Sequence, residues 1–523
     1  MSAASVSDPS AIGGQASVSA PPALYEINLR VLLFELGREL GRPATLDDIP
    51  DAYLDRVASL GCDWIWLLGI WQTGAHGDRL ARTHAGVGRE LKETLADLTA
   101  ADIASSPFAV QQLRVHTAYG DAAGLARLRA RLQARGLKLM LDFVPNHTAV
   151  DHPWASAHPE YFVQGSREDL ARQPDAYVEV QTAVGPKILA HGRDPYFPAW
   201  TDTLQLNYRH AGLRAAQTAE LLRLATLCDG LRCDMAMLLL PEVIDKTWSQ
   251  ASLPADGTAP VDRPFWEEVI PKLKAKAPGF TLMAEVYWDL EWQIQQQGFD
   301  FAYDKRLYDR LHTHDAHGVR QHLKASMAFQ RRLARFLENH DEPRAAARFT
   351  PAEQRAAAVI TFLSAGLKLL HEGQLEGRKA RVPMQLVRRP QEAADKTLAD
   401  FYRDLFRCVR RDEVSRGHFQ LLDCVPAWDG NPTADHFVSF TWRTKSGRQL
   451  LCTVNYGDTA AQCYAQLPFS ELRGRRHVLR DLMSPATYER DGDELVARGL
   501  YLDLPAWGFH VFEMRPVGEN AVP

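Results

Sequence analysis

Short apolar runs alternate with longer segments of helical periodicity from Leu24 to about residue 412. Such runs are typical of buried parallel strands. Between them, segments such as 121–135 repeat leucines at the three-to-four-residue spacing of a helix, and Gly136 follows as a helix-ending residue. The runs that fit a strand are 25–33, 62–70, 137–144, 231–236, 281–286, 299–303, 335–339 and 366–371. Eight strands that alternate with helices predict an α/β fold, a (β/α)8 TIM barrel.

Two regions interrupt this alternation. Residues 147–210, after the third strand, are rich in proline and aromatic residues and are too long for an ordinary loop, which predicts a small inserted domain. After about Gly417, short alternating segments separated by Gly, Asp and Asn predict a C-terminal antiparallel β domain. The expected division is a disordered tail at 1–23, the barrel at 24–146 and 211–412, the inserted domain at 147–210 and a β-sandwich at 417–523.

Composition narrows the class of protein. The 523 residues include 60 Lys and Arg against 65 Asp and Glu, a net charge of −5, with 46% hydrophobic residues. This balance predicts a folded globular protein and gives no reason to expect a nucleic-acid partner. No apolar run is long enough to predict a membrane span, and no glycine-rich nucleotide fingerprint is present.

Cysteine usage and the N-terminal residues suggest where the protein works. The seven cysteines are scattered without a Cys-x-x-Cys pair, and residues 1–23 lack the basic and apolar regions of a secretory signal. We therefore expect a cytoplasmic protein. The oligomeric state stays open.

Charged side chains stand at the ends of four predicted strands: Asp142, then Arg232 with Asp234, then Glu285, then His340 with Asp341. A TIM barrel gathers the carboxyl ends of its strands around one mouth, where active sites lie. Glycosidic bond cleavage needs one ionised carboxylate, one carboxylic acid and negative charge near an oxocarbenium-like centre. The pattern indicates that chemistry.

Four collinear segments resemble motifs of the α-amylase superfamily of retaining glycoside hydrolases and transglycosylases. They are 142–147 (DFVPNH), 230–236 (GLRCDMA), 283–287 (MAEVY) and 336–341 (FLENHD). The resemblance implies that Asp234 is the nucleophile, Glu285 the acid/base and Asp341 a third acid that binds sugar hydroxyls. It also implies a substrate-binding role for Asp142, His147, Arg232 and His340.

Departures from the family pattern narrow the expected substrate. Phe108 can stack on a sugar, but the second aromatic residue and the acid expected near it are missing, and Met237-Leu238 stand where many amylases have Lys-His. Arg344 resembles a pattern of relatives that act on short α-glucosides. We therefore expect a hydrolase of short α-glucosides or α-glucan oligosaccharides, with an oligosaccharide or disaccharide as its partner.

Two other functions remain open from the sequence. A transglycosylase would use the same intermediate, and a non-catalytic carbohydrate-binding barrel is the more remote alternative. No cofactor is required, but Asn146 matches a calcium ligand of many relatives, so a structural calcium ion is also left open.

Overall fold

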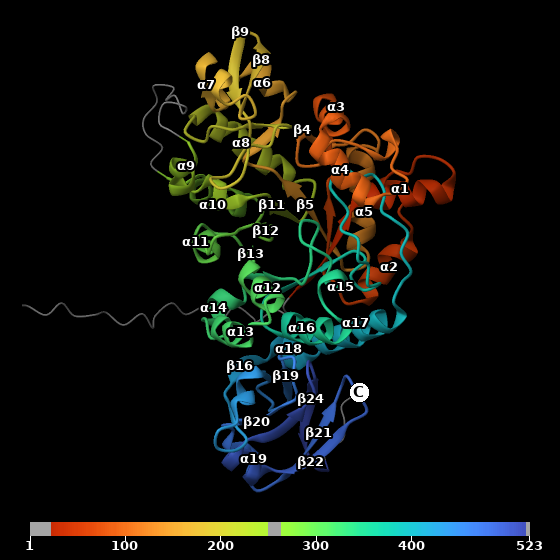
Figure 1. Ribbon diagram of the computed structural model, residues 1–523, viewed down its shortest axis with the longest axis vertical. Helices are drawn as coiled ribbons and strands as arrows, with labels where there is room; N and C mark the ends of the chain where they lie inside the picture. The colour runs from red at the N-terminus through yellow and green to blue at the C-terminus, as the bar shows by residue number, and fades with distance from the viewer. Residues whose placement is uncertain (1–21, 249–262, 519–523) are drawn as a thin grey trace, which may run out of the picture.

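The computed structural model describes residues 22–248 and 263–518. Within these residues, eight parallel strands close into a barrel in chain order, and the last strand pairs with the first (Figure 1). They are β1 (Ala23–Asn28), β2 (Trp64–Leu68), β5 (Lys138–Phe143), β11 (Gly230–Cys233), β12 (Thr281–Ala284), β13 (Phe301–Tyr303), β14 (Leu333–Arg335) and β15 (Leu367–His371). The predicted TIM barrel is confirmed.

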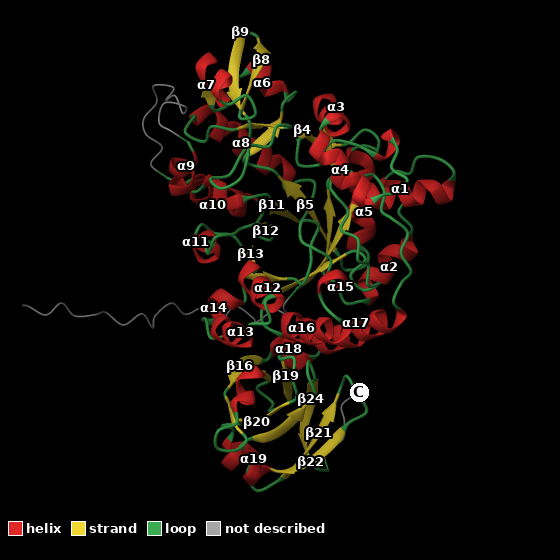
Figure 2. Cartoon of the chain, in the orientation of Figure 1, coloured by secondary structure: helices red, strands yellow, loops and turns green. Residues whose placement is uncertain are grey.

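Helices follow the strands and surround them (Figure 2). They are α1 (Leu29–Leu40), α2 (Asp51–Ser59), α5 (Ala122–Gln133), α8 (Ala211–Leu224), α9 (Pro241–Thr247), α10 (Phe265–Lys276), α11 (Glu291–Gln296), α12 (Lys305–His312), α13 (Ala316–Leu323), α14 (Met327–Gln330), α15 (Ala345–Arg348), α16 (Pro351–Leu363), α17 (Lys396–Val409) and α18 (Asp412–Arg416). Helix α5 shows the local logic: Asp121 caps its start by accepting from the Gly124 N–H at 2.8 Å. Gly136, at a φ of 73°, then turns the chain toward β5.

Two excursions rise from the barrel. After β2, the chain forms α3 (Ala75–Thr83), α4 (Ala85–Thr94) and the pair β3 (Trp71–Thr73) and β4 (Val110–Val115). After β5, the antiparallel pair β6 (His147–Ala149) and β10 (Thr203–Gln205) carries α6 (Pro153–Ala157), α7 (Arg167–Arg172) and the three-stranded sheet of β7 (Gln164–Gly165), β8 (Tyr177–Thr182) and β9 (Gly185–Ala190). This second excursion projects at the top of the molecule in Figure 1.

The C-terminal strands form two antiparallel sheets at the opposite end of the molecule (Figure 1). One sheet holds β16 (His418–Leu422), β18 (Phe437–Arg443), β19 (Gln449–Asn455), β24 (Phe509–Pro516), β21 (Arg476–Asp481) and β22 (Thr487–Asp491), and the other holds β17 (Cys424–Pro426), β20 (Ala461–Ala465) and β23 (Leu500–Leu504). Helix α19 (Gly492–Arg498) precedes β23. The Trp442 indole N–H donates to the Leu363 carbonyl at 2.7 Å, so the domain is fixed to α16. The predicted C-terminal β domain is confirmed.

The N-terminal boundary differs from the prediction. Residues 1–21 of the predicted tail lie outside the described residues, but Ala23 already belongs to β1 and donates its N–H to Asp63 Oδ2 at 2.8 Å. The strand expected over 25–33 ends at Asn28, because the Asn28 side chain accepts from the Val31 N–H and starts α1.

The seventh barrel strand also lies earlier than predicted. Strand β14 covers Leu333–Arg335, and the buried run that follows it turns instead of extending the strand. The Asn339 side chain accepts from the backbone N–H groups of Asp341 and Glu342, both at 3.0 Å, and so ends the extended chain. This turn brings Asp341 to the mouth of the barrel. No described helix has the length and apolar character needed to cross a membrane.

Candidate active site

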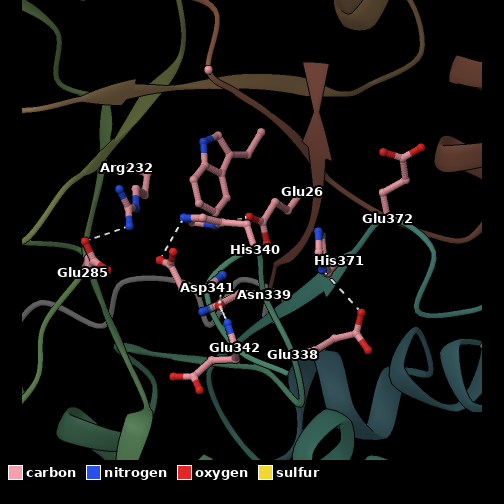
Figure 3. Close-up of polar contacts among 12 residues, drawn as sticks. Glu26, Arg232, Glu285, Glu338, Asn339, His340, Asp341, Glu342, His371 and Glu372 are labelled. Atoms are coloured by element: carbon pink, nitrogen blue, oxygen red, sulfur yellow. Dashed lines mark hydrogen bonds and ion pairs between the residues drawn. The ribbon is translucent and has the colours of Figure 1, made fainter. Parts of the chain in front are cut away.

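Charged side chains from five barrel strands lie at or near the carboxyl ends of those strands, and Figure 3 shows four of them: Glu26, Arg232, Glu285 and Asp341. Glu26 lies in β1, Asp142 in β5 and Arg232 in β11, while Glu285 directly follows β12 and Asp341 follows β14. Enzymes with this fold place their active sites at this end of the barrel. The positions that the sequence marked at strand ends therefore surround one site.

Arg232 joins the two predicted catalytic carboxylates. Its Nη1 lies 2.6 Å from Asp234 Oδ1, and its Nη2 lies 2.7 Å from Glu285 Oε2. The guanidinium is fully buried, and both carboxylates are nearly so. Met235, at a left-handed φ of 41°, also donates its N–H to Glu285 Oε2 at 2.7 Å. One guanidinium can bridge two carboxylates only if these are close together, so Asp234 and Glu285 face one small space.

The surroundings of Glu285 favour the protonated, neutral form of its carboxyl group. Burial raises the pKa of its carboxyl group to about 7, and the negative charges of Asp234 and Asp341 act in the same direction. The positive charge of Arg232 opposes this rise. The Tyr287 hydroxyl donates to the other oxygen, Oε1, at 2.8 Å. A carboxyl group that titrates near neutral pH can both give and take a proton.

The other two carboxylates have different surroundings. Burial raises the pKa of Asp234, although the charge and hydrogen bond of Arg232 pull it down. Asp341 is the more accessible acid, with 43% of its side chain exposed, and its Oδ2 lies 3.0 Å from His340 Nε2. Desolvation would raise the pKa of Asp341, but the contact with His340 and the charges of Arg232 and Arg381 together outweigh it and hold this pKa at about 2. Asp341 is thus a permanent negative charge at the mouth.

Asp142 is bonded to neighbouring residues of the barrel wall. Its side chain is buried, and its two oxygens accept from the Trp66 indole N–H at 3.0 Å and the Gly69 N–H at 2.8 Å. Its backbone carbonyl accepts from the Trp71 indole N–H at 2.7 Å. These bonds hold the Asp142 carboxylate between the Trp66 indole and the Gly69 backbone, in the wall of the barrel.

Phe108 reaches the site from the first excursion, and His147 lies next to the Phe108 backbone at the base of the second. The Phe108 ring stacks on His340 with centroids 5.4 Å apart, and the Arg232 guanidinium lies 5.3 Å from the same ring. His147 is buried at the base of the inserted domain, where its ring lies 5.1 Å from the Trp200 ring. Burial lowers the pKa of His147 to about 4, and a hydrogen bond to the Phe108 backbone opposes that shift. His147 is therefore neutral near pH 7, and its hydrogen bond to the Phe108 backbone is its link to the site.

Arg344, which was predicted to bind substrate, lies in the protein interior. Its side chain is buried, and its Nη1 lies 2.6 Å from Glu338 Oε1 and donates to His371 Nδ1 and the Glu372 carbonyl, both at 2.8 Å. Each of these partners belongs to the protein interior. The arginine neutralises the fully buried Glu338 and so stabilises the chain between β14 and α15.

Asn146 does not fit a calcium site. Its Oδ1 accepts from the Gln205 amide at 2.9 Å, and the same amide nitrogen donates to the Asn146 carbonyl at 3.0 Å and the Leu206 carbonyl at 3.2 Å. A nitrogen with two hydrogens thus lies among the oxygens that a cation would need. Within residues 22–248 and 263–518, no cluster of three or more His, Cys, Asp or Glu side chains could hold a metal.

Two residues of this site were missed in the sequence. Tyr287 lies two positions after Glu285, and the two-residue repeat of extended chain would have placed both side chains on one face. Glu26 lies inside an apolar strand run and contacts His340 (Figure 3). Burying an unpaired carboxylate costs folding free energy, so an acid inside an apolar strand indicates a buried partner. Glu26 could have been found in the sequence by this argument.

Comparisons with known proteins agree with this geometry. Residues 52–420 match the family model described as "Alpha amylase, catalytic domain". Alpha-amylase MalA from Haloarcula japonica is 25% identical over 442 residues, which cover 83% of this chain and 55% of that protein. The chain spans about half the length of the curated relatives it matches.

Solved structures share the fold across the whole described architecture. An alpha-amylase from Lactobacillus plantarum superposes with a TM-score of 0.64 at 21% identity, covering 94% of this chain and 98% of that one. A maltogenic alpha-amylase from Thermotoga neapolitana gives a TM-score of 0.61 at 17% identity, with the same coverages of 94% and 98%. Because the family model covers most of the barrel and the strand-end residues converge on one site, this chain belongs to the alpha-amylase family of glycoside hydrolases.

Proposed function

We propose that this chain is a retaining α-glycosidase that cleaves short α-glucosides or α-glucan oligosaccharides by double displacement. The observation that carries this proposal is the bridge from Arg232 to both Asp234 and Glu285. Retaining glycosidases hold their two carboxyl groups about 5 Å apart, whereas inverting ones leave room for a water between them. Two carboxylates on one guanidinium fit the closer arrangement.

The residues divide the two chemical steps between them. Asp234, kept ionised by Arg232, attacks the anomeric carbon while the proton of Glu285 passes to the departing oxygen; the glycosidic bond breaks and a glycosyl ester forms. Ionised Glu285 then takes a proton from water, which attacks the same carbon and releases Asp234. Asp341 and His340 bind ring hydroxyls, and Phe108 packs beside the sugar.

A cavity next to Glu285 could hold the part of a short substrate that departs when the glycosidic bond breaks. It has a volume of about 470 Å³ and is lined by Phe197, Met235, Tyr287 and Trp288 among others. Met235 and Tyr287 both bond to Glu285, so the cavity adjoins the group that protonates the departing oxygen. Aromatic faces such as Phe197, whose side chain is exposed, are suited to stack on sugar rings.

The test is turnover of an aryl α-glucoside by the full chain and by Asp234→Asn. We expect release of the aryl alcohol by the wild type only, with the α-anomer of glucose as the first product in proton NMR. A first product of β configuration would overturn the retaining mechanism. Equal turnover by both proteins would remove Asp234 from its role, and sugar binding without turnover would favour a non-catalytic barrel.

Product analysis separates hydrolysis from transfer. Maltose and maltotriose are incubated separately with the wild type, and the products are resolved by chromatography. Shorter sugars and glucose alone support the hydrolase, whereas longer or isomeric saccharides support a transglycosylase that uses the same intermediate.

We also propose that the protein works in a reducing compartment such as the cytoplasm. The seven cysteines are all free thiols, and six of them are buried. Fractionation of the source cells with an antibody against the chain tests this.

A further inference from the structure

A buried carboxylate on β1 contacts the histidine that binds Asp341 (Figure 3). Glu26 Oε1 lies 2.5 Å from His340 Nδ1, and His340 Nε2 lies 3.0 Å from Asp341 Oδ2. The side chains of Glu26 and His340 are each only 1% exposed. The imidazole is further fixed by Phe108, stacked on one face, and by the Trp66 ring, edge-on at 5.5 Å. His340 therefore has one orientation, with a carboxylate at each ring nitrogen.

This arrangement requires a charged imidazole. An ionised carboxylate can only accept hydrogen bonds, so a ring between two of them is best matched when both nitrogens carry hydrogen. Burial would lower the pKa of His340, but Asp341 and Glu26 raise it to about 10. Desolvation likewise opposes ionisation of Glu26, and His340 is foremost among the groups that nevertheless lower its pKa.

The remaining charged groups around this site come from the other barrel strands and the residues that follow them, together with Arg381 from the chain after β15, which acts on Asp341. Arg232 from β11 and His371 from β15 act on Glu26, and Asp142 from β5 interacts with His340. Glu285 faces Asp341 from β12. Arg232 is already shared between two carboxylates, so His340 is the cation that directly contacts Asp341.

Glu26 is more than a packing residue. Its Oε2 is buried and has no hydrogen-bond partner among the described residues. An unsatisfied carboxylate oxygen in the interior is costly, and such atoms in native structures call for a functional explanation. A neutral Gln could make the same single contact to Nδ1 through its oxygen. What only Glu can add is the charge.

We propose that Glu26 is a positioning residue that holds His340 as a cation, with its Nε2, which has no hydrogen-bond partner among the described residues, beside Asp341 and available to the sugar hydroxyl that Asp341 binds. The charge and orientation needed at the sugar are thus set from β1 before the substrate arrives. This inference rests on the proposed function, because it assigns a task within the same site.

The first test reads the charge of His340 without any substrate. Glu26→Gln keeps the shape and the acceptor at Oε1 but removes the charge. Protein labelled with ¹⁵N-histidine is titrated by NMR, and His340→Asn identifies the signal. We expect the wild-type ring to stay doubly protonated to about pH 9 and the Glu26→Gln ring to lose its proton more than about one pH unit lower. Equal titrations would overturn the proposal.

Glu338→Gln is the matched control. Glu338 is also a fully buried carboxylate at this end of the barrel, but its partners are Arg344 and His371. This variant should leave the His340 titration unchanged, and a shift as large as that of Glu26→Gln would overturn the assignment to Glu26. Because neither measurement needs turnover, they decide the charge of His340 even if the proposed function fails.

The second test reads catalysis. The Glu285→Gln variant is assayed with 2,4-dinitrophenyl α-glucoside, whose leaving group needs no proton. The fall of kcat/KM at high pH that Glu285 would cause is then absent. Adding Glu26→Gln should lower kcat/KM at least about tenfold and create a new basic limb at the pH where His340 loses its proton. Unchanged kcat/KM at all pH values would overturn the positioning role. A lack of turnover already in the wild type contradicts the proposed function instead.

Discussion

The Tyr287 hydroxyl donates to Glu285 Oε1 at 2.8 Å, a contact between two residues of the 283–287 motif that the motif itself does not reveal. A hydrogen bond to a carboxylate favours its ionised form and so opposes the effect of burial. Glu285 is therefore subject to opposing influences: burial and two neighbouring acids favour the proton, whereas Arg232 and the donors on both oxygens favour its loss. The resulting pKa near 7 is what an acid/base catalyst needs.

The first prediction concerns pH. Glu285 must carry its proton when the leaving group departs, so kcat/KM for maltotriose should fall as pH rises through about 7. Asp234 must be ionised, so kcat/KM should also fall on the acid side, as pH drops through its raised pKa. A bell-shaped profile of initial rates checks both limbs. Constant kcat/KM between pH 6 and 9 would contradict the role of Glu285.

The second prediction concerns Tyr287→Phe. Loss of the hydroxyl removes a donor that favours ionised Glu285, so the basic limb should move up by about half to one pH unit. Initial rates across the same pH range measure it. Tyr402→Phe is the control, because the buried Tyr402 hydroxyl bonds to Gln354 and Gln374 away from the site and its loss should leave both limbs in place. A downward shift for Tyr287→Phe would contradict the argument.

The third prediction concerns Glu285→Gln. The amide cannot give a proton, so maltotriose cleavage should slow by about 10²–10⁴-fold. Cleavage of 2,4-dinitrophenyl α-glucoside should slow far less, because its leaving group departs as a stable anion. Comparing kcat/KM for the two substrates gives the ratio. Losses of equal size would mean that Glu285 acts through structure and not through proton transfer.

The barrel and the carboxylates that meet at its mouth could be predicted from the sequence because parallel strands buried on both faces are continuously apolar. An acid such as Asp234 or Glu285 at the end of such a run is conspicuous. The end of β1 was harder to predict, since Leu29 and the residues after it are as apolar as the strand and only the Asn28 cap separates strand from helix. The turn at Asn339 depends on side-chain bonds that no apolar pattern displays.

The sequence also did not show in which direction the polar side chains point. Arg344 resembles a pattern of relatives that act on short α-glucosides, but its side chain pairs with the buried Glu338 in the interior. Glu26 and His340 are 314 residues apart, and they meet only because β1 and β14 both pair with β15. Such pairings follow from closure of the barrel and not from local sequence.

The fourth prediction concerns metal removal. The Gln205 amide nitrogen lies among the Asn146 and Leu206 oxygens, so no calcium ion is needed to hold the inserted domain on the barrel. Treatment with EDTA followed by gel filtration should leave the thermal unfolding midpoint and the kcat unchanged. Gln205→Ala should lower the midpoint in the same assay, because it leaves these buried oxygens without a donor. A drop of the midpoint after EDTA that calcium restores would contradict this assignment.

The fifth prediction separates structure from substrate binding at Arg344. Arg344→Met removes the main cation from the fully buried Glu338 and should cost about 3–5 kcal/mol of unfolding free energy. The KM for maltotriose should stay within about twofold, because the short bonds of Arg344 go to the buried residues Glu338, His371 and Glu372. Urea unfolding and steady-state kinetics measure the two effects. Adding Glu338→Gln should recover part of the lost stability, since the unpaired charge is then gone. A large rise in KM with unchanged stability would instead return Arg344 to the substrate site.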